Sequence, residues 1–355
     1  MEMKTEDLLG KDKTLIIRAD ANSKIGIGHV MRCLALAQEW MDRGGRAIVV
    51  GKIANTTLVK KIRNLGLEYE PIDVSYPDSE NDAQILLQVA KSAPAGSWIV
   101  LDGYFLDTIY QKRIRKNHPN TLVIDDCHHL KKYDAAVILN QNLGAETIVY
   151  NVNENAIVLA GSKYVLLRKE FRTSTAKHPV TANDGHISVL VSMGGADALN
   201  VSLTILQALQ ALGNKIELTL VVGPAYPHRH SLDHFAQNST FNFNIKSNVE
   251  NMAELIAEND IIIGAGGSSC WEVCSIGRPL VIITTADNQI RISEKLEEAA
   301  AAVYLGSAEK IDHETIYHAV KFLVKDTGKR QELSRKALEI FDNKGVSRVV
   351  DILVE

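Results

Sequence analysis

Near the start of the chain, two glycines precede a histidine in the run GIGHVMR, residues 26–32. The apolar run before them predicts a strand and the pattern after them predicts a helix, so His29 begins a helix. The positive end of a helix dipole favours the neutral imidazole, which can act as a general base near pH 7. We therefore expect His29 to be a catalytic base. The alternative is that His29 only caps the helix or packs against it.

The same turn offers candidates for contact with a substrate. Its glycines allow a close approach to the backbone, and Arg32 lies one helical turn after His29, where it faces either the same site or solvent. The run lacks the third glycine of a dinucleotide fingerprint and the Gly-Lys-Ser/Thr of a P-loop. The residues predicted to bind substrate here are Asp20, Gly26, Gly28 and Arg32.

Two glycine-rich loops in the second half of the chain resemble phosphate-binding turns. Residues 193–197 (MGGAD) and residues 264–269 (GAGGSS) each join a predicted strand to a predicted helix. Such loops present backbone N–H groups to an anion, and the helix dipole favours phosphate. Each loop alone could be a simple tight turn, but two of them on one half predict a bound nucleotide diphosphate. The residues expected there are Gly194, Gly195, Gly267, Ser268 and Ser269.

Two further features could recognise the rest of a nucleotide-sugar. Glu272 lies in the helix after the second glycine loop, where its carboxylate could accept hydrogen bonds from ribose hydroxyls. The polar loop TTADNQ, residues 284–289, carries amides that suit sugar hydroxyls. The alternative for this loop is that Asp287 only caps the following helix.

Polar residues also follow two predicted strands of the first half. Asp102 and Tyr104 come after one strand, and the run DDCHH, residues 125–129, comes after the next. Both groups lie at the same edge if the sheet is parallel. The run DDCHH has the residue types of a metal site, but adjacent His128 and His129 would point in different directions, and no second cluster completes the site. We therefore expect no metal and no cofactor.

The elements that must position these residues follow from the hydrophobic pattern. Short β-branched apolar runs alternate with longer amphipathic segments, which predicts an α/β fold with doubly wound sheets. The polar stretch 173–186 interrupts this alternation and is typical of a linker. We predict an N-terminal Rossmann-like catalytic and sugar-binding domain at 1–172, a C-terminal nucleotide-binding Rossmann-like domain at 187–330, and C-terminal helices at 331–355. Two such domains would face a cleft, where ligands of open α/β sheets bind.

Composition excludes several classes of protein. The 355 residues include 39 Lys and Arg against 43 Asp and Glu, a net charge of −4, which argues against nucleic-acid binding. No apolar run approaches the roughly 18 residues of a membrane helix, and the charged N-terminus lacks the apolar core of a signal peptide. The four cysteines are scattered, as expected of reduced thiols. We expect a soluble, cytoplasmic monomer.

Five segments, taken in order, carry a resemblance to a known family. They are RADANSKIGIGHVMRCLALA, LDGYFLD, VSMGGAD, GAGGSSCWEVCSIGRPLV and TTADNQ. Together they resemble the UDP-sugar hydrolases of pseudaminic acid biosynthesis, which release UDP from UDP-2,4-diacetamido-2,4,6-trideoxy-β-L-altropyranose, and the related spore-coat polysaccharide proteins. The family is similar to the GT-B glycosyltransferases, notably the one that makes lipid II. The C-terminal helical region, residues 309–355, is longer here than in compact members.

The resemblance implies a GT-B fold and a UDP-sugar as the small-molecule partner. It implies that water, activated by His29, attacks C1 of the sugar with inversion, and that UDP leaves. It places Tyr104 and Asn288 in the catalytic site and Glu272 on the ribose. The residues that it places at or near the diphosphate are Gly194, Gly195, Ser268 and Ser269.

Two other functions remain open. A glycosyltransferase that passes the sugar to an alcohol or lipid acceptor would share the fold and the UDP site. Such an enzyme usually shows an apolar membrane-facing patch in its N-terminal half, and the sequence shows no clear one. A nucleotide-sugar-binding protein without activity is the other alternative, and the presence of both His29 and Tyr104 argues against it.

Overall fold

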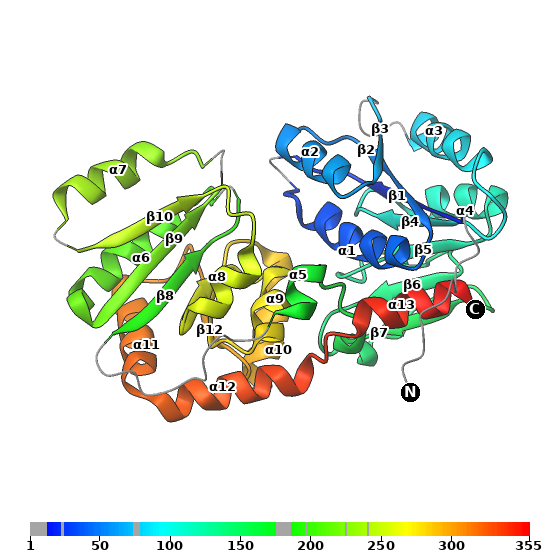
Figure 1. Cartoon of the computed structure of the whole chain (residues 1–355). Helices are drawn as coiled ribbons and strands as arrows, with labels where there is room; N and C mark the ends of the chain where they lie inside the picture. Colours follow the sequence, from blue (N-terminus) through cyan, green and yellow to red (C-terminus); the bar gives the residue numbers. More distant parts are fainter. Residues whose placement is uncertain are drawn as a thin grey trace, which may run out of the picture. The chain divides into compact units, whose positions relative to one another are not determined.

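The chain folds into two compact α/β units. The structure is a computed structural model that describes residues 13–22, 25–73, 79–174, 186–195, 197–223, 226–239 and 241–355. Unit 1 consists of Met1–Lys169 with Lys344–Glu355, and unit 2 of Glu170–Asn343. Each unit is a parallel sheet flanked by helices (Figure 1), which confirms the predicted class of two Rossmann-like domains. The cleft expected between the two domains stays a prediction.

Unit 1 is built on a seven-stranded parallel sheet in the order β3-β2-β1-β4-β5-β6-β7. The strands are β1 (Thr14–Ala19), β2 (Arg46–Gly51), β3 (Glu68–Pro71), β4 (Trp98–Asp102), β5 (Thr121–Ile124), β6 (Val137–Asn140) and β7 (Ile157–Ala160). The strand order reverses between β1 and β4, and ligands of open α/β sheets bind beyond the carboxyl ends at such a point. In this register Ala19 pairs with Asp102, so the loops after β1 and β4 begin side by side.

Helices cover both faces of this sheet. They are α1 (Gly28–Asp42), α2 (Thr56–Asn64), α3 (Ser79–Lys91), α4 (Thr108–Asn117) and α13 (Gly345–Val354), and α5 (Lys169–Thr173) lies at the boundary with unit 2. Although α13 ends the chain, it packs against α1 (Figure 1). Its residues Val346, Val349, Val350 and Leu353 are buried at the i, i+3, i+4, i+7 spacing of one helix face.

Unit 2 is built on a six-stranded parallel sheet in the order β10-β9-β8-β11-β12-β13. The strands are β8 (Ile187–Ser192), β9 (Ile216–Val222), β10 (Phe243–Ser247), β11 (Ile261–Gly264), β12 (Leu280–Thr284) and β13 (Val303–Ser307). The helices are α6 (Val201–Leu209), α7 (Arg229–Asn238), α8 (Met252–Glu258), α9 (Ser269–Ile276), α10 (Ile290–Glu298), α11 (His313–Lys325) and α12 (Thr327–Ile340). Ser192 pairs with Gly264, so the two glycine-rich loops leave adjacent strands at one edge of the sheet.

The observed division of the chain differs from the predicted one at its C-terminal end. Residues 331–355 do not form a separate group of helices, because α12 contacts α9 and α11 of unit 2 whereas α13 belongs to unit 1. Amphipathic spacing predicts that a segment is helical, but it does not identify the sheet that the helix covers. Most of the predicted linker 173–186 lies outside the described residues.

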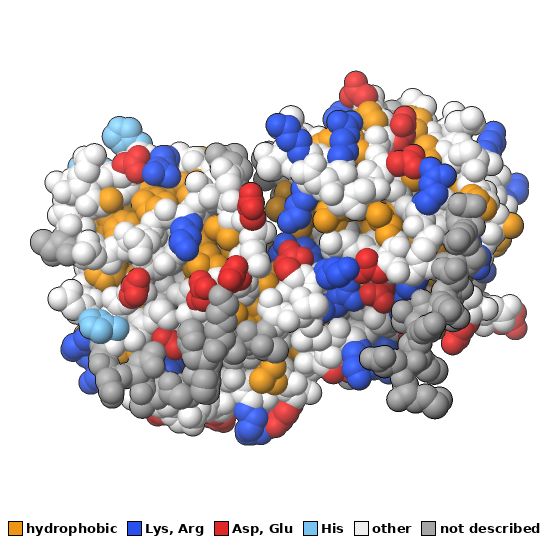
Figure 2. Space-filling model, viewed as in Figure 1, with side chains coloured by type: hydrophobic (Ala, Val, Ile, Leu, Met, Phe, Trp, Pro, Cys, Tyr) orange, Lys and Arg blue, Asp and Glu red, His pale blue; other side chains and the backbone are white. Residues whose placement is uncertain are grey.

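The surface of the described chain is mixed in charge. Lys and Arg side chains are interspersed with Asp and Glu over the visible faces of both units (Figure 2), as the totals of 39 and 43 suggest. Among the described residues, no helix combines the length and the apolar character needed to cross a bilayer.

Candidate functional site

The centre of the site in unit 1 is a pair formed by His29 and Asp102. The chain leaves β1, turns at Gly26 with a φ of +71°, and enters α1, whose second residue is His29. Asp102 is the last residue of β4, which lies beside β1. Nδ1 of His29 lies 2.6 Å from Oδ1 of Asp102, and both residues are buried, with exposed fractions of 9% and 1%.

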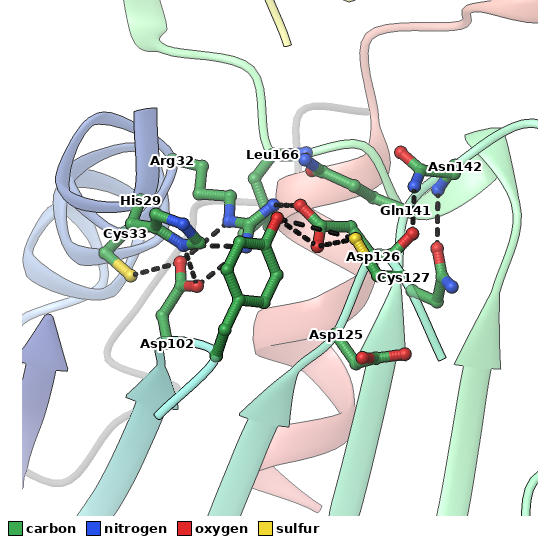
Figure 3. A network of polar contacts seen from close by, with 12 residues as sticks. His29, Arg32, Cys33, Asp102, Asp125, Asp126, Cys127, Gln141, Asn142 and Leu166 are labelled. Carbon is green, nitrogen blue, oxygen red and sulfur yellow. Dashed lines mark hydrogen bonds and ion pairs between the residues drawn. The ribbon is translucent and has the colours of Figure 1, made fainter. Parts of the chain in front are cut away.

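Arg32 extends this pair to a second carboxylate. It lies one turn after His29 on α1, and its Nε and Nη2 atoms each donate to Asp102 at 2.7 Å. Its Nη1 atom donates to Oδ2 of Asp126, also at 2.7 Å. Figure 3 shows His29, Arg32 and Cys33 pointing from α1 toward Asp102. The sequence predicted Arg32 as a substrate ligand, but the structure buries it between two carboxylates of its own unit.

This arrangement determines which nitrogen of His29 can act as a base. Burial by itself raises the pKa of Asp102, but the charge of Arg32 and the hydrogen bonds from Arg32 and His29 outweigh burial and hold that pKa well below its usual range. An ionised carboxylate can only accept hydrogen bonds. Arg32 Nη2 also lies near His29 Nδ1, at 3.1 Å, but the carboxylate contact is shorter by half an ångström and keeps the proton on Nδ1. Nε2 is therefore the basic nitrogen.

Tyr104 lies beside His29. The two rings meet edge to face with their centroids 5.0 Å apart, and the Tyr104 hydroxyl donates to Oδ1 of Asp126 at 2.8 Å. Tyr104 is 37% exposed, so it can reach a ligand. Burial raises the pKa of Asp126, but the charge of Arg32 more than offsets this and lowers the pKa below its usual range. One ionised carboxylate thus binds both Arg32 and Tyr104.

The residues of the run 125–129 serve different partners. Asp126 binds Arg32 and Tyr104, whereas the buried Asp125 lies 3.0 Å from Nδ1 of His129 and accepts a 2.7 Å bond from the Tyr150 hydroxyl. Burial raises the pKa of the Cys127 thiol to about 11, so this thiol stays protonated near neutral pH. Within the described ranges, no group of three His, Cys, Asp or Glu side chains is placed to hold a metal ion.

Asp20 lies in a separate polar network at the end of β1. Its carboxylate forms an ion pair with the buried Arg18 and accepts a 2.7 Å bond from the backbone N–H of Lys52. Arg18 also binds Asp82, with its Nη2 atom 2.6 Å from Oδ2. The structure therefore uses the Asp20 carboxylate to link β1 to its neighbours, and substrate binding by Asp20 stays a prediction.

In unit 2 three glycines of the two glycine-rich loops face open space. A Cβ atom added to Gly194, Gly195 or Gly267 would meet no atom within 4 Å. Gly194 has a φ of +87°, which a side chain would strain. Asp197 already caps α6, because its carboxylate accepts bonds of 2.9 Å from the backbone N–H groups of Val201 and Ser202. An anion at this edge would therefore depend on the loops themselves and on the N-terminus of α9.

The N-terminus of α9 has no side-chain cap. Its N-cap residue, Ser268, makes no capping hydrogen bond, and both Ser268 and Ser269 are exposed. The positive end of a helix suits a phosphate. Glu272 lies in the first turn of this helix and is half-buried, one helical turn from that end.

Asn288 lies exposed in the loop after β12. It belongs to the short 3₁₀ helix η4 (Asp287–Gln289), and the side chain of Gln289 fixes this loop by accepting a 2.8 Å bond from the N–H of Thr285. Neither η4 nor α10 has a side-chain cap at its N-terminus. Asp287 is not the N-cap residue of either helix, and Asn288 is exposed, so a ligand could reach it.

The residues that sequence reasoning missed are the partners of His29 and Tyr104. From the sequence alone, Asp102 is only the end of a predicted strand, and Asp126 is only a possible metal ligand. The signal for Asp102 is its position at the end of β4, because β4 lies beside β1, the strand that precedes His29. The pairing of β1 with β4 depends on the strand order of the folded sheet.

The fold and the matches to known proteins define a class. The chain shares the fold of MurG from Acinetobacter baumannii, with a TM-score of 0.65 and 16% identity over 96% of this chain and 99% of that one. Residues 186–349 match the family model described as the glycosyltransferase family 28 C-terminal domain. The protein therefore has the two-domain fold of the GT-B glycosyltransferases.

Three relatives confirm the resemblance stated from the sequence. The chain is 25% identical over 280 residues to the uncharacterized protein MJ1062 of Methanocaldococcus jannaschii, covering 76% of this chain and 55% of that protein. It is 25% identical over 224 residues to the spore coat polysaccharide biosynthesis protein SpsG of Bacillus subtilis, covering 62% and 65%. It is 26% identical over 258 residues to the UDP-2,4-diacetamido-2,4,6-trideoxy-β-L-altropyranose hydrolase of Campylobacter jejuni, covering 71% and 84%. The chain thus spans less than two thirds of the length of the first two relatives.

Proposed function

We propose that this protein is a UDP-sugar hydrolase that releases UDP from a UDP-2,4-diacetamido-2,4,6-trideoxyhexose, a reaction of pseudaminic acid biosynthesis. The observation that carries the proposal is the His29–Asp102 pair, which leaves Nε2 of a nearly buried histidine as a base beside Tyr104. The substrate class is supported by the Campylobacter jejuni hydrolase, because the similarity extends over 84% of that protein.

The proposed reaction is a single displacement at C1. Nε2 of His29 takes a proton from water while the oxygen forms a bond to C1, and the C1–O bond to the diphosphate breaks with its electron pair on UDP. Attack from the opposite face inverts the configuration at C1. The imidazolium that forms keeps its Nδ1–H bond to Asp102, which stabilises the positive charge. His29 then returns its proton to solvent.

The negative charge of the leaving group determines the role of unit 2 in the proposed reaction. UDP departs as an anion, so it needs charge stabilisation rather than full protonation. Backbone N–H groups of the loops at Gly194, Gly195 and Gly267 and the positive end of the α9 dipole would bind the diphosphate. Glu272 would bind the ribose hydroxyls, and Asn288 the sugar.

The test is UDP release in the absence of any acceptor. We expect the wild-type protein to release UDP from UDP-diacetamido-trideoxyhexoses, with NMR showing the inverted anomer first. His29→Ala is expected to lower turnover by roughly 10²–10⁴-fold with nearly unchanged UDP binding. His318→Ala, on the exposed face of α11, serves as the matched control and keeps full turnover. Near-normal turnover of His29→Ala would show that His29 is not the base.

One observation favours a second candidate, a glycosyltransferase of polysaccharide biosynthesis. Residues 186–349 match the C-terminal domain of glycosyltransferase family 28, and the fold is shared with MurG. A transferase would place an acceptor hydroxyl where the hydrolase places water. UDP release that requires an added alcohol or lipid acceptor supports this candidate and contradicts the hydrolase.

A further inference from the structure

The carboxylate of Asp126 lies between Arg32 and Tyr104 and binds each of them with a different oxygen. Oδ2 accepts a 2.7 Å bond from Nη1 of Arg32, and Oδ1 accepts a 2.8 Å bond from the Tyr104 hydroxyl. The backbone oxygen of Asp126 accepts a 2.9 Å bond from the side chain of Asn142, which helps to fix the loop after β5. The proposed mechanism gives this carboxylate no role.

Arg32 determines which oxygen of Asp126 faces Tyr104. The guanidinium is itself held by Asp102, which accepts 2.7 Å bonds from Nε and Nη2, and Arg32 is 7% exposed. Figure 3 shows Arg32 reaching both carboxylates, Asp102 and Asp126. A guanidinium can only donate hydrogen bonds, so the atom of Asp126 that it contacts must be an acceptor. The other oxygen of Asp126 is left for Tyr104.

The proton of the Tyr104 hydroxyl points at Asp126. Burial raises the pKa of Asp126, but the charge of Arg32 and the hydrogen bonds from Arg32 and Tyr104 together lower it below its usual range. The carboxylate is therefore ionised at neutral pH and can only accept, and a tyrosine hydroxyl has a single proton to give. Toward any other group, the Tyr104 oxygen is then an acceptor. The Cys127 thiol, whose Sγ lies 3.6 Å from this oxygen and 3.4 Å from Oδ1 of Asp126, can donate to either.

We propose that Asp126 is a positioning residue that fixes the polarity of Tyr104: by accepting the hydroxyl proton, it makes Tyr104 present an acceptor to the bound reactants. Tyr104 is 37% exposed, and its ring lies edge to face against His29 with centroids 5.0 Å apart, so the hydroxyl belongs to the same site. The hydrogen bonds themselves lie within unit 1. The consequence for catalysis rests on the proposed function, in which His29 and Tyr104 act on a UDP-sugar and water.

This polarity defines the class of group that Tyr104 recognises. Phosphate oxygens and acetamido carbonyl oxygens carry no proton, so they cannot bind a hydroxyl oxygen that only accepts. The partner must be an N–H or O–H donor, which the sugar supplies in its acetamido N–H groups and hydroxyl, and which the attacking water also supplies. Nε2 of His29 is likewise an acceptor. The two side chains together therefore suit a proton-bearing reactant, whereas the diphosphate is assigned to unit 2.

The first experiment locates the hydroxyl proton without any substrate. A neutron crystal structure of the deuterated protein is expected to show the Tyr104 deuteron directed at Oδ1 of Asp126. In Asp126→Asn, the donor-only Arg32 keeps the amide oxygen, so the new NH₂ group faces Tyr104 and the hydroxyl deuteron turns away from it. A deuteron carried by Asp126 in the wild type, or a Tyr104 hydroxyl with the same orientation in both proteins, overturns the proposal.

The second experiment is a double-mutant cycle with Tyr104→Phe, measured by UDP release from UDP-2,4-diacetamido-2,4,6-trideoxy-β-L-altropyranose. Asp126→Asn turns the hydroxyl proton toward a donor, so we expect kcat/KM to fall by about 10- to 100-fold. In the Tyr104→Phe background there is no hydroxyl to reverse, and the same substitution is expected to change kcat/KM by less than about threefold. Equal losses in the two backgrounds would show that Asp126 acts without Tyr104, and would contradict the proposal.

The division of the loss between KM and kcat identifies the donor. A raised KM with little change in kcat in Asp126→Asn supports a donor on the sugar, because the lost interaction is then made in the bound ground state. A lowered kcat with unchanged KM supports the attacking water as the donor. Wild-type kcat and KM in a folded Asp126→Asn would overturn the proposal.

Asp134 supplies the matched control within unit 1. Its carboxylate also accepts from an arginine and from a neutral side chain, with Arg115 Nη1 at 3.1 Å and Asn153 Nδ2 at 2.8 Å. Asp134→Asn is expected to keep the wild-type kcat/KM, and a loss as large as that of Asp126→Asn would contradict a specific role for Asp126. If no form of the protein releases UDP, the proposed function fails, while the neutron structures still decide whether Asp126 fixes the polarity of Tyr104.

Discussion

Nδ1 of His29 lies 2.6 Å from the carboxylate of Asp102, although 73 residues separate the two in the chain. The parallel pairing of β1 with β4 brings them together, because Ala19 and Asp102 are register partners. Asp102 is fully buried and binds Arg32 with both of its oxygens. The carboxylate therefore cannot turn away from the imidazole without breaking two charged hydrogen bonds.

The first prediction concerns this carboxylate. Asp102→Asn is expected to lower kcat by about 10²–10⁴-fold, because an amide can donate to Nδ1 and shift the proton to Nε2, which removes the base. UDP affinity, which depends on unit 2, should stay within about twofold of wild type. Asp107→Asn is the matched control, since Asp107 caps α4 through Tyr110 N–H and asparagine caps equally well. Full activity of Asp102→Asn would show that His29 does not need the Asp102 carboxylate to act as a base.

The second prediction concerns Arg32 and the pH dependence of stability. Arg32→Met leaves the buried carboxylates of Asp102 and Asp126 without their cation, at a cost of about 3–5 kcal/mol at pH 7. Their pKa values are lowered in the folded protein. The ion pairs of Arg32 thus stabilise the folded wild type at pH values above the aspartate pKa of the unfolded chain, about 3.9. This stability is lost as the pH falls below that pKa toward the lowered pKa values of the folded protein.

Urea unfolding of unit 1 at pH 7 and at about pH 3 checks this sign. The difference in unfolding free energy between wild type and Arg32→Met should shrink at the lower pH. Arg335→Met on α12 is the control, because its ion pair with Glu339 is exposed on both sides and contributes little to stability. A difference that stays constant or grows in acid contradicts the assignment of Arg32 as the cation of this cluster.

The site shows which relationships a single sequence can and cannot reveal. The position of His29 at a helix start was predictable, because a strand, a glycine turn and a helix are local features. Its partner was not, because the strand order β1-β4 is a property of the folded sheet. Asp125 and Asp126 are adjacent and identical in type, yet one binds His129 and the other binds Arg32. Only the direction of each side chain separates their roles.

The third prediction tests the phosphate-binding loop of unit 2. A Cβ atom at Gly267 would meet nothing within 4 Å, so Gly267→Val is expected to fold with a melting temperature close to that of wild type. If the diphosphate lies against this loop, the added side chain occupies its place and raises the Kd for UDP by at least about tenfold. Calorimetric titration with UDP measures the effect, and the melting curve of the same sample serves as control. Unchanged UDP affinity in a folded Gly267→Val would exclude this loop from the nucleotide site.

The last prediction tests which unit the C-terminal helix stabilises. Leu353 is 4% exposed and belongs to the same hydrophobic core as the buried residues of α1. Leu353→Ala is expected to cost about 2–5 kcal/mol through lost burial and the cavity that remains. Because α13 contacts α1, hydrogen exchange should accelerate in α1 and leave α9 of unit 2 unchanged. Ile109→Ala, at a position 71% exposed, is the control and should change neither. Faster exchange confined to unit 2 would show that α13 stabilises unit 2 and not unit 1. The C-terminal helix would then have no part in holding α1 and His29 in position.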